Sequence, residues 1–220
     1  MRTVITLPMI KNRKIPLRFQ KDDNRFPEIL VENFLMHYTE PGDKVIDIFA
    51  GLGTTLLVAE ELEREAFGIE LDKDRFEYVR TILTNKQNIF NENSLNLDKL
   101  NLPKMDFAFG SPTYMNEFER ENPLTGFTEK GTYQDYLEFL KEIYSKLKKV
   151  MKKGAYVVIE VSNLKYDKKI TTLAWDIGKT ISDVFRFEGE IIINWTTPQE
   201  DVEFSYGYGY DHSYCLVFKK

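Results

Sequence analysis

The segment Asp47-Ile-Phe-Ala-Gly-Leu-Gly-Thr-Thr55 constrains the fold more than any other part of this chain. It continues an apolar, β-branched run, Lys44–Ala50, which predicts a buried strand, and leads into Thr54–Arg64, which predicts a helix. Glycines at a strand-to-helix turn let the backbone approach a ligand closely. The loop is not a Walker A loop, because no Lys follows the second glycine, and it lacks the third glycine of the dinucleotide fingerprint. Taken alone, a tight strand-to-helix turn explains it equally well.

Strand-like and helix-like segments alternate along the rest of the chain. Further strands are expected at Ala66–Leu71, Asn88–Asn91, Met105–Gly110, Gly154–Val161, Phe187–Trp195 and Ser213–Phe218. Further helices are expected at Phe26–Tyr38, Asp72–Thr84, Tyr133–Met151 and Ile170–Phe185. This order predicts an α/β fold with a mostly parallel sheet, closed by an antiparallel C-terminal hairpin at one edge.

Length and charge suggest one domain with a basic extension. The chain has 220 residues, and no repeat or low-complexity linker divides it. Residues 1–25 hold seven basic and two acidic side chains, whereas the whole chain has a net charge of −5. We therefore expect a basic N-terminal arm at 1–25 and one domain at 26–220. The arm fits either a polyanionic partner or a solvated terminus.

Composition excludes several other classes of protein. One cysteine, Cys215, and two histidines make a structural zinc site very unlikely, so no metal is expected. No apolar run reaches the roughly 18 residues of a membrane helix, and the first residues do not form a signal peptide. A cytoplasmic protein that does not bind membranes is expected.

An acidic residue follows the second expected strand. Glu70 lies 23 residues after Asp47, at a strand end where a carboxylate can accept hydrogen bonds from ribose hydroxyls. A solvated Glu at a strand end is the simpler alternative. The combination with the glycine loop favours a nucleoside ligand.

The segment Gly110-Ser-Pro-Thr-Tyr114 follows the strand expected at Met105–Gly110. Ligands of open α/β sheets bind outside the carboxyl ends of the strands, so this segment is expected to face the same crevice. The Ser111 hydroxyl and the Pro112 carbonyl offer two hydrogen-bond acceptors, and Tyr114 offers a flat face for stacking. An enzyme that binds a planar exocyclic amine needs these groups, although Ser and Pro are also ordinary turn residues.

These motifs together resemble the S-adenosylmethionine-dependent amino-methyltransferases of nucleic-acid bases, the group that contains cytosine-N4 and adenine-N6 DNA methylases. The resemblance spans Phe26 to Lys219. Asp47–Thr55 is similar to the family's Asp-x-Phe-x-Gly-x-Gly-Thr-Thr loop. Ser111–Tyr114 resembles its catalytic (Asp/Asn/Ser)-Pro-Pro-(Tyr/Phe/Trp) motif, in the Ser variant typical of cytosine-N4 enzymes. The resemblance implies a Rossmann-like class I methyltransferase fold, a three-layer sandwich.

The resemblance also implies a role for each matching residue. S-Adenosylmethionine is expected at Phe26, Asp47, Phe49, Ala50, Gly51, Gly53, Thr54, Thr55, Glu70, Leu71, Asn93 and Ser94. The catalytic residues are expected to be Ser111, Pro112 and Tyr114, with Thr113 at the substrate. Two positions depart from the family pattern: Thr113 stands at its second proline, and Asn93 stands at its adenine-binding Asp.

The expected reaction is methylation of the N4 amine of cytosine in nucleic acid. Nearly all residues belong to the expected core, which leaves no separate target-recognition domain, so structured RNA such as ribosomal RNA is favoured over DNA. Alternatives are a DNA cytosine-N4 or adenine-N6 methylase, a non-catalytic cofactor-binding relative, and a protein-glutamine methylase.

The connection between the last two expected strands is rich in aromatic residues. Tyr206 and Tyr208 alternate with glycines there, which suits stacking on an unpaired base. Acidic neighbours make the segment locally negative, and tyrosines that cover a sheet edge are the alternative. We expect both tyrosines to contact the substrate.

Overall fold

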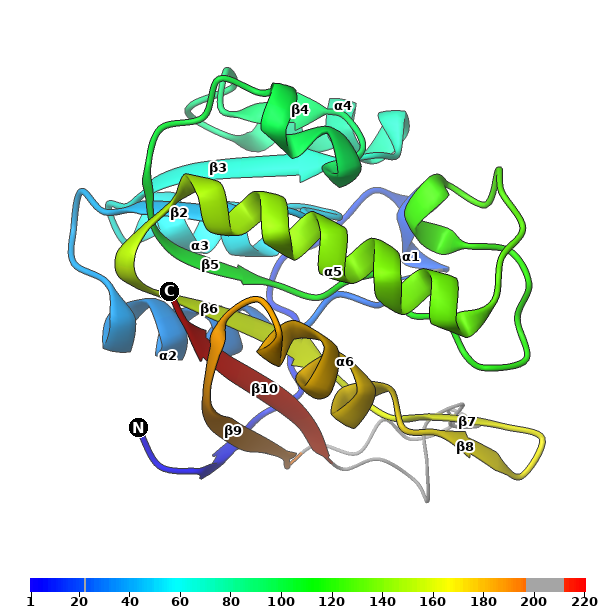
Figure 1. Ribbon diagram of the computed structural model, residues 1–220. Coiled ribbons are helices and arrows are strands. Elements are labelled where there is room, and N and C mark those ends of the chain that lie inside the picture. The colour runs from blue at the N-terminus through cyan, green and yellow to red at the C-terminus, as the bar shows by residue number, and fades with distance from the viewer. Residues whose placement is uncertain (22, 197–211) are drawn as a thin grey trace.

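A computed structural model describes residues 1–21, 23–196 and 212–220 (Figure 1). Its main sheet has eight strands in the order β1-β9-β10-β6-β5-β2-β3-β4. These are β1 (Val4–Leu7), β2 (Lys44–Asp47), β3 (Glu65–Glu70), β4 (Ile89–Asn91), β5 (Met105–Gly110), β6 (Met151–Val161), β9 (Arg186–Trp195) and β10 (His212–Lys219). A separate two-stranded sheet consists of β7 (Leu164–Tyr166) and β8 (Lys169–Thr171).

Helices cover both faces of the main sheet. They are α1 (Leu17–Gln20), α2 (Glu28–Tyr38), α3 (Thr54–Glu61), α4 (Lys73–Ile82), α5 (Tyr133–Val150) and α6 (Leu173–Ser182), with 3-10 turns η1 (Ser94–Lys99) and η2 (Pro123–Thr125). One hydrophobic core packs α5 and α6 against the sheet, and a second packs α2 and α3 against the opposite face (Figure 1). The predicted α/β three-layer sandwich is thereby confirmed.

The strand pairing explains where the ends of the strands meet. Strands β4, β3, β2, β5 and β6 pair in parallel, so their carboxyl ends lie along one edge of the sheet. Strand β10 runs antiparallel between β6 and β9, which is the expected C-terminal hairpin. This hairpin does not form the edge of the sheet, because β1 pairs in parallel with β9 outside it.

Helix α5 shows how local sequence signals set an element in place. The Thr132 side chain accepts from the backbone of Asp135, and the Asp135 carboxylate accepts from the backbone of Thr132, which is a capping box. Tyr136, Leu140 and Ile143 recur at helical spacing and are fully buried in the core. The cap and this apolar face fix the helix beside the loop that follows β5.

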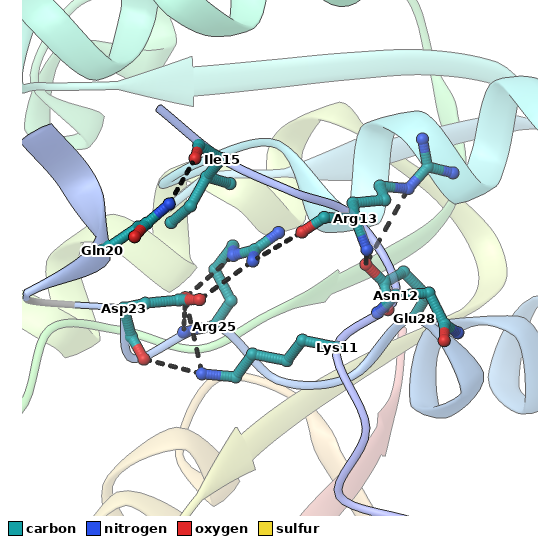
Figure 2. Close-up of polar contacts among 8 residues, drawn as sticks. All are labelled: Lys11, Asn12, Arg13, Ile15, Gln20, Asp23, Arg25 and Glu28. Carbon is teal, nitrogen blue, oxygen red and sulfur yellow. Dashed lines mark hydrogen bonds and ion pairs between the residues drawn. The ribbon is translucent and has the colours of Figure 1, made fainter. Parts of the chain in front are cut away.

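The N-terminal residues correct the expectation of a basic arm. Residues 4–7 form β1 within the main sheet, where Val4 pairs with Ile192. Arg13 and Lys11 form ion pairs with Glu28 and Asp23, and Arg25 donates to Asp23 with its Nε atom at 2.8 Å (Figure 2). Several basic charges of this segment are thus neutralised by local acidic partners rather than free for phosphates.

A second correction concerns the segment expected to begin a helix at Ile170. Helix α6 starts at Leu173, because residues 164–171 form the β7–β8 hairpin. Tyr166 pairs with Lys169, so the turn between the strands has two residues, Asp167 and Lys168. Their φ angles are 43° and 64°, as a hairpin turn of this length needs.

Candidate active site

A cavity of about 480 Å³ opens at the carboxyl ends of β2, β3, β5 and β6. Its size is typical of small-molecule sites. Predicted site residues that line it are Phe26, Asp47, Phe49, Ala50, Gly51, Thr54, Glu70, Leu71, Asn93, Ser94, Ser111, Pro112, Thr113 and Tyr114. Gly53 and Thr55 do not line it. Tyr206 and Tyr208 lie outside the described residues, so their role stays a prediction.

Gly53 and Thr55 support the loop from behind. Gly53 precedes α3 with a φ of 82°, and a Cβ atom there would lie 2.9 Å from Cγ1 of Val79. Both the backbone conformation and the close packing therefore require glycine. Thr55 is fully buried in the first turn of α3. These two residues shape the glycine loop without facing the cavity.

Glu70 ties the end of β3 to the glycine loop. Its Oε2 accepts from the backbone nitrogen of Gly51 at 2.6 Å, and its Oε1 accepts from that of Asp72 at 2.8 Å. Burial raises the pKa of this carboxyl, and the two backbone hydrogen bonds act in the opposite direction. A carboxylate has about four acceptor positions, so Glu70 can still accept from ribose hydroxyls.

Asp47 lies deeper in the cavity wall. Its Oδ1 accepts from the backbone nitrogen of Phe49 at 2.9 Å, and only 2% of the residue is exposed. Burial raises its pKa from 3.8 to about 7. A Cβ atom on Gly110 would collide with the Asp47 carboxylate, which explains why β5 ends in glycine.

The cavity fits a nucleoside cofactor with a charged amino-acid tail. Among the described residues, Thr54 lines the cavity and has a buried Oγ1 with no hydrogen-bond partner. Buried hydroxyls are normally paired, so an unpaired one in a cavity wall indicates a position for a ligand atom. The two acidic side chains Asp47 and Glu70 offer acceptors for an ammonium group and for ribose hydroxyls. These residues fit S-adenosylmethionine.

Asn93 and Ser94 hold neighbouring backbone. The Asn93 side chain donates to the Leu124 carbonyl and accepts from the Leu95 backbone nitrogen, both at 2.8 Å. The Ser94 hydroxyl donates to the Ile48 carbonyl, next to Asp47. Asn93 Oδ1 keeps one acceptor position, and its predicted contact with adenine remains a prediction.

A chain of hydrogen bonds runs through the predicted catalytic motif. The Ser111 hydroxyl donates to the phenol oxygen of Tyr114 at 3.3 Å, and Tyr114 donates to Oε2 of Glu160 at 3.1 Å. The backbone nitrogen of Ser162 also donates to the Tyr114 oxygen, at 3.2 Å. The loop after β5 is thus attached to the end of β6 through one phenol group.

Glu160 is a site residue that sequence reasoning missed. It lines the cavity and is 9% exposed, and burial raises its pKa although nearby hydroxyl groups, including that of Tyr114, oppose the shift. A signal was present, because Glu160 interrupts an otherwise apolar strand end, Ala155–Val161. An acidic residue in such a run is expensive to bury and therefore indicates a function.

The remaining acceptors of the motif face the same space. Pro112 lines the cavity, and no described residue donates a hydrogen bond to its carbonyl oxygen. The carbonyl of Thr113 accepts from the phenol of Tyr136 at 3.1 Å, which anchors the loop to α5. Thr113 is exposed where the family pattern has a second proline. The loop is held by side chains instead of by that proline ring.

Other classes of site are not found among the residues that the structure describes. No group of three or more His, Cys, Asp or Glu side chains is placed to hold a metal ion there. No helix in residues 1–21, 23–196 and 212–220 is long and apolar enough to cross a membrane.

Comparisons with known proteins identify the family and the fold of the chain. The family model of the N6/N4 methyltransferases, described as "DNA methylase", matches residues 10–81 and 105–220, which is most of the chain. The type II methyltransferase M.BglII from Bacillus subtilis is 38% identical over 60 residues, 27% of this chain and 17% of the relative. The matched stretch therefore spans less than a fifth of that relative.

Solved structures show the same fold at low sequence identity. TrmN from Thermus thermophilus is 16% identical with a TM-score of 0.60, over 92% of this chain and 52% of that chain. A SAM-dependent methyltransferase from Archaeoglobus fulgidus is 17% identical with a TM-score of 0.56, over 93% and 100% of the two chains. The Rossmann-like class I methyltransferase fold predicted from the motifs is confirmed.

Proposed function

This chain belongs to the DNA methylase family of N6/N4 methyltransferases, and from that membership we propose that it methylates the N4 amine of cytosine in nucleic acid. The observation that supports the proposal most strongly is the chain of hydrogen bonds from Ser111 through Tyr114 to Glu160, in the same cavity as Glu70. The cavity thus contains hydrogen-bond acceptors for a target amine, around Ser111, and hydrogen-bond acceptors for a nucleoside cofactor, at Glu70.

The acidic side of the cavity binds the cofactor in this proposal. Glu70 would accept hydrogen bonds from the ribose hydroxyls, and Asp47 would accept from the ammonium group. Thr54 would supply a hydroxyl that has no other described partner. S-Adenosylmethionine supplies an electrophilic methyl group on a sulfonium. The orientation of the bound base toward that group is the task of the loop after β5.

The Ser111 Oγ and the Pro112 carbonyl oxygen accept hydrogen bonds from the two N–H groups of the target amine. Because the Ser111 hydroxyl hydrogen is directed to Tyr114, the lone pairs of its Oγ remain for the amine. Two acceptors on one amine favour a pyramidal nitrogen, whose lone pair is then directed away from the ring and toward the methyl group. Glu160 keeps this arrangement by accepting a hydrogen bond from the Tyr114 hydroxyl.

The base must leave its stack to reach such a cavity. Extruding a nucleotide costs a few kcal/mol in a duplex and least where the base is already unpaired. Unpaired loops are the parts of RNA that proteins read by sequence. Structured RNA is therefore the favoured substrate, and Ser at position 111 favours cytosine over adenine.

DNA is the second candidate substrate. It is supported by the family description "DNA methylase" and by the similarity of one stretch of the chain to the type II methyltransferase M.BglII. Under this alternative proposal, the same residues would act on cytosine N4 or adenine N6 in DNA.

One experiment separates these possibilities. The purified chain is incubated with methyl-labelled S-adenosylmethionine and, separately, with RNA, DNA and protein from cells, and the labelled products are digested to nucleosides or amino acids. The expected product is N4-methylcytidine from RNA. Labelled N4-methyldeoxycytidine or N6-methyldeoxyadenosine would show that the substrate is DNA. Label only in protein, or equal incorporation by Ser111→Ala, contradicts it.

A further inference from the structure

An aromatic and lysine-rich surface lies beside the candidate active site, outside the cavity. It consists of the β7–β8 hairpin, residues 164–171, and Phe118 of the loop after β5, and we name it the hairpin surface. The rings of Phe118 and Tyr166 are stacked, with centroids 6.3 Å apart and an interplanar angle of 29°. Tyr166 is 60% exposed and Phe118 is 37% exposed. Lys169 holds its Nζ 4.6 Å from the centroid of Phe118.

The hairpin surface is attached directly to the catalytic motif. Phe118 follows Tyr114 by four residues, a length of chain that spans at most about 14 Å. The hairpin begins two residues after Ser162, whose backbone nitrogen donates to the Tyr114 oxygen. The backbone nitrogen of Glu117 donates to Oγ1 of Thr171 at 3.1 Å and joins the two parts.

The hairpin meets the main core only at its base, where Leu164 packs against the core and Thr171 is buried. Its two strands form a sheet of their own, separate from the eight-stranded sheet. A two-stranded hairpin is marginally stable in water by itself. Its turn residues Asp167 and Lys168 both have positive φ, which costs energy for side chains other than glycine. A hairpin that projects an exposed aromatic ring on such a turn is better explained by binding than by packing.

The charges of the hairpin match a polyanion. Residues 164–171 include Lys165, Lys168 and Lys169 against one acid, Asp167, in a chain whose net charge is −5. Glu117 and Glu119 make the neighbouring loop acidic, so phosphates fit along the hairpin and not along that loop. Flat rings beside lysines are the combination that binds unpaired nucleotides, with bases stacked on the rings and phosphates on the ammonium groups.

We propose that the hairpin surface binds the unpaired strand that flanks the target base, with a neighbouring base stacked on Tyr166 and Phe118 and its phosphates at Lys168 and Lys169. This proposal rests on the proposed function, since it assumes a nucleic-acid substrate in the adjacent cavity. It adds a second contact area that positions the strand while the target base enters the cavity.

The test uses the full chain, a fluorescein-labelled 12-nucleotide single-stranded RNA rich in cytidine, and the same sequence as DNA and as RNA duplex. Binding is measured by fluorescence anisotropy over a series of salt concentrations. Tyr166→Ala is expected to raise the dissociation constant about tenfold, as loss of one base–aromatic stack does, whereas Tyr166→Phe keeps the ring and binds normally. The double variant Lys168→Gln, Lys169→Gln is expected to reduce the log–log salt slope by roughly 1.4, since each phosphate contact on a single strand contributes about 0.7.

Controls separate this proposal from the proposed function. Lys86→Gln changes an exposed lysine after α4, far along the sheet, and is expected to leave the salt slope unchanged. For every variant, calorimetry gives the affinity for S-adenosylmethionine, thermal melting gives stability, and labelled cofactor gives methyl transfer. All hairpin variants are expected to keep cofactor affinity and melting temperature.

The outcomes are distinct. Methyl transfer to RNA by the wild type, with normal oligonucleotide binding by the hairpin variants, overturns the hairpin proposal and leaves the proposed function standing. Weakened binding by these variants without methyl transfer to any nucleic acid supports the hairpin surface and removes the proposed function. A wild-type chain that binds no oligonucleotide, or that uses Tyr166 to bind a protein, overturns the hairpin proposal.

Discussion

The phenol oxygen of Tyr114 lies 3.1 Å from Oε2 of Glu160, and this contact connects the loop after β5 to the end of β6. Tyr114 is therefore more than a flat surface for a base, because its hydroxyl fixes the direction of the Ser111 hydroxyl. If Glu160 were protonated it could donate to Tyr114, and the direction of the whole chain could reverse. In the proposed reaction, the ionisation of Glu160 would thus control which acceptors the target amine meets.

The first prediction concerns this chain of hydrogen bonds. Tyr114→Phe keeps the ring and removes the hydroxyl, and we expect kcat to fall roughly 10- to 100-fold because Ser111 is no longer oriented. Cofactor affinity is expected to stay the same, since the phenol contacts Ser111, Glu160 and Ser162. Single-turnover methyl transfer and calorimetry measure the two quantities. A variant with wild-type kcat would show that the hydroxyl is dispensable.

The pH dependence gives a second readout for Glu160. Burial raises its pKa above the usual value of 4.5, so we expect turnover to fall as pH decreases through that raised pKa. Glu160→Gln keeps a carbonyl oxygen for Tyr114 but cannot ionise, so part of the rate should remain while the acid limb of the pH–rate profile flattens. An unchanged acid limb would assign the titration to another group.

A further prediction concerns cofactor binding by Glu70. Glu70→Ala removes the acceptor for the ribose hydroxyls and also leaves the backbone nitrogens of Gly51 and Asp72 without their partner. We expect the affinity for S-adenosylmethionine to fall by roughly 1–3 kcal/mol, the usual value of hydrogen bonds to a charged group. Calorimetry measures the change. Glu65→Ala, at the other end of β3, is the matched control and should bind normally.

The raised pKa of Asp47 leads to a prediction about how stability depends on pH. Its pKa is raised from 3.8 to about 7 in the folded protein, so the folded state binds more protons than the unfolded state between these values. The free energy of unfolding is therefore highest below pH 4, where Asp47 is neutral in both states. It decreases as the pH rises from 4 to 7, and the total decrease from this one group is at most about 4 kcal/mol. Asp47→Asn should make the protein without cofactor more stable than wild type at pH 8 and no more stable at pH 4.

Urea unfolding at both pH values measures this difference, and Asp74→Asn, an exposed carboxyl in α4, serves as the control. We expect Asp47→Asn to weaken cofactor binding in the same samples, because a neutral amide accepts a hydrogen bond from an ammonium group but cannot form an ion pair with it. Equal stability of wild type and variant at pH 8 would show that Asp47 ionises normally.

The sequence predicted the fold well where periodicity and turn chemistry agree. The strand Met105–Gly110 has the predicted bounds, because an apolar run there ends at the Gly that Asp47 requires. Strand β1 was missed because its four residues are too few to show a periodic pattern, and their partner, β9, is about 190 residues away. The β7–β8 hairpin was missed because its turn has no glycine, although such turns favour one.

The candidate site was predicted best where backbone geometry determines it. The glycine loop and the strand-end Glu70 follow from the requirements of a βαβ unit. Glu160 was missed because its role depends on Tyr114, 46 residues earlier in the chain, and the sequence of β6 shows only an apolar strand with one acid. A contact between two distant strand ends is a property of the sheet order, which motifs alone do not show.

The departure at Thr113 can be tested by restoring the family pattern. Thr113→Pro keeps the carbonyl that accepts from Tyr136 at 3.1 Å, so the anchor to α5 remains. Proline also restricts the unfolded chain, which stabilises by about 0.4–1 kcal/mol where the native backbone is compatible. We expect equal or higher kcat and a slightly higher melting temperature. Loss of activity with normal cofactor binding would show that the threonine side chain itself is needed at the substrate.

The last prediction concerns the N-terminal segment, which the sequence suggested as a free basic arm. The Glu28 carboxylate accepts from the backbone nitrogens of Asn12 and Arg13, at 2.9 and 3.1 Å, and so fixes this segment to the start of α2 (Figure 2). Glu28→Ala leaves both donors without that acceptor, and we expect the free energy of unfolding to fall by about 1–3 kcal/mol.

The salt dependence of oligonucleotide binding separates the two interpretations of this segment. In Glu28→Ala, Lys11 and Arg25 keep their partner Asp23. Arg13 loses Glu28 but keeps its ion pair with Glu61, so the salt slope should stay unchanged while stability falls. Glu32→Ala on the same helix is the matched control and should affect stability less, because no hydrogen bond from the N-terminal segment to Glu32 is present in the described residues. Unchanged stability after Glu28→Ala, together with a flatter salt slope after deletion of residues 1–21, would instead assign the segment's charges to phosphate binding.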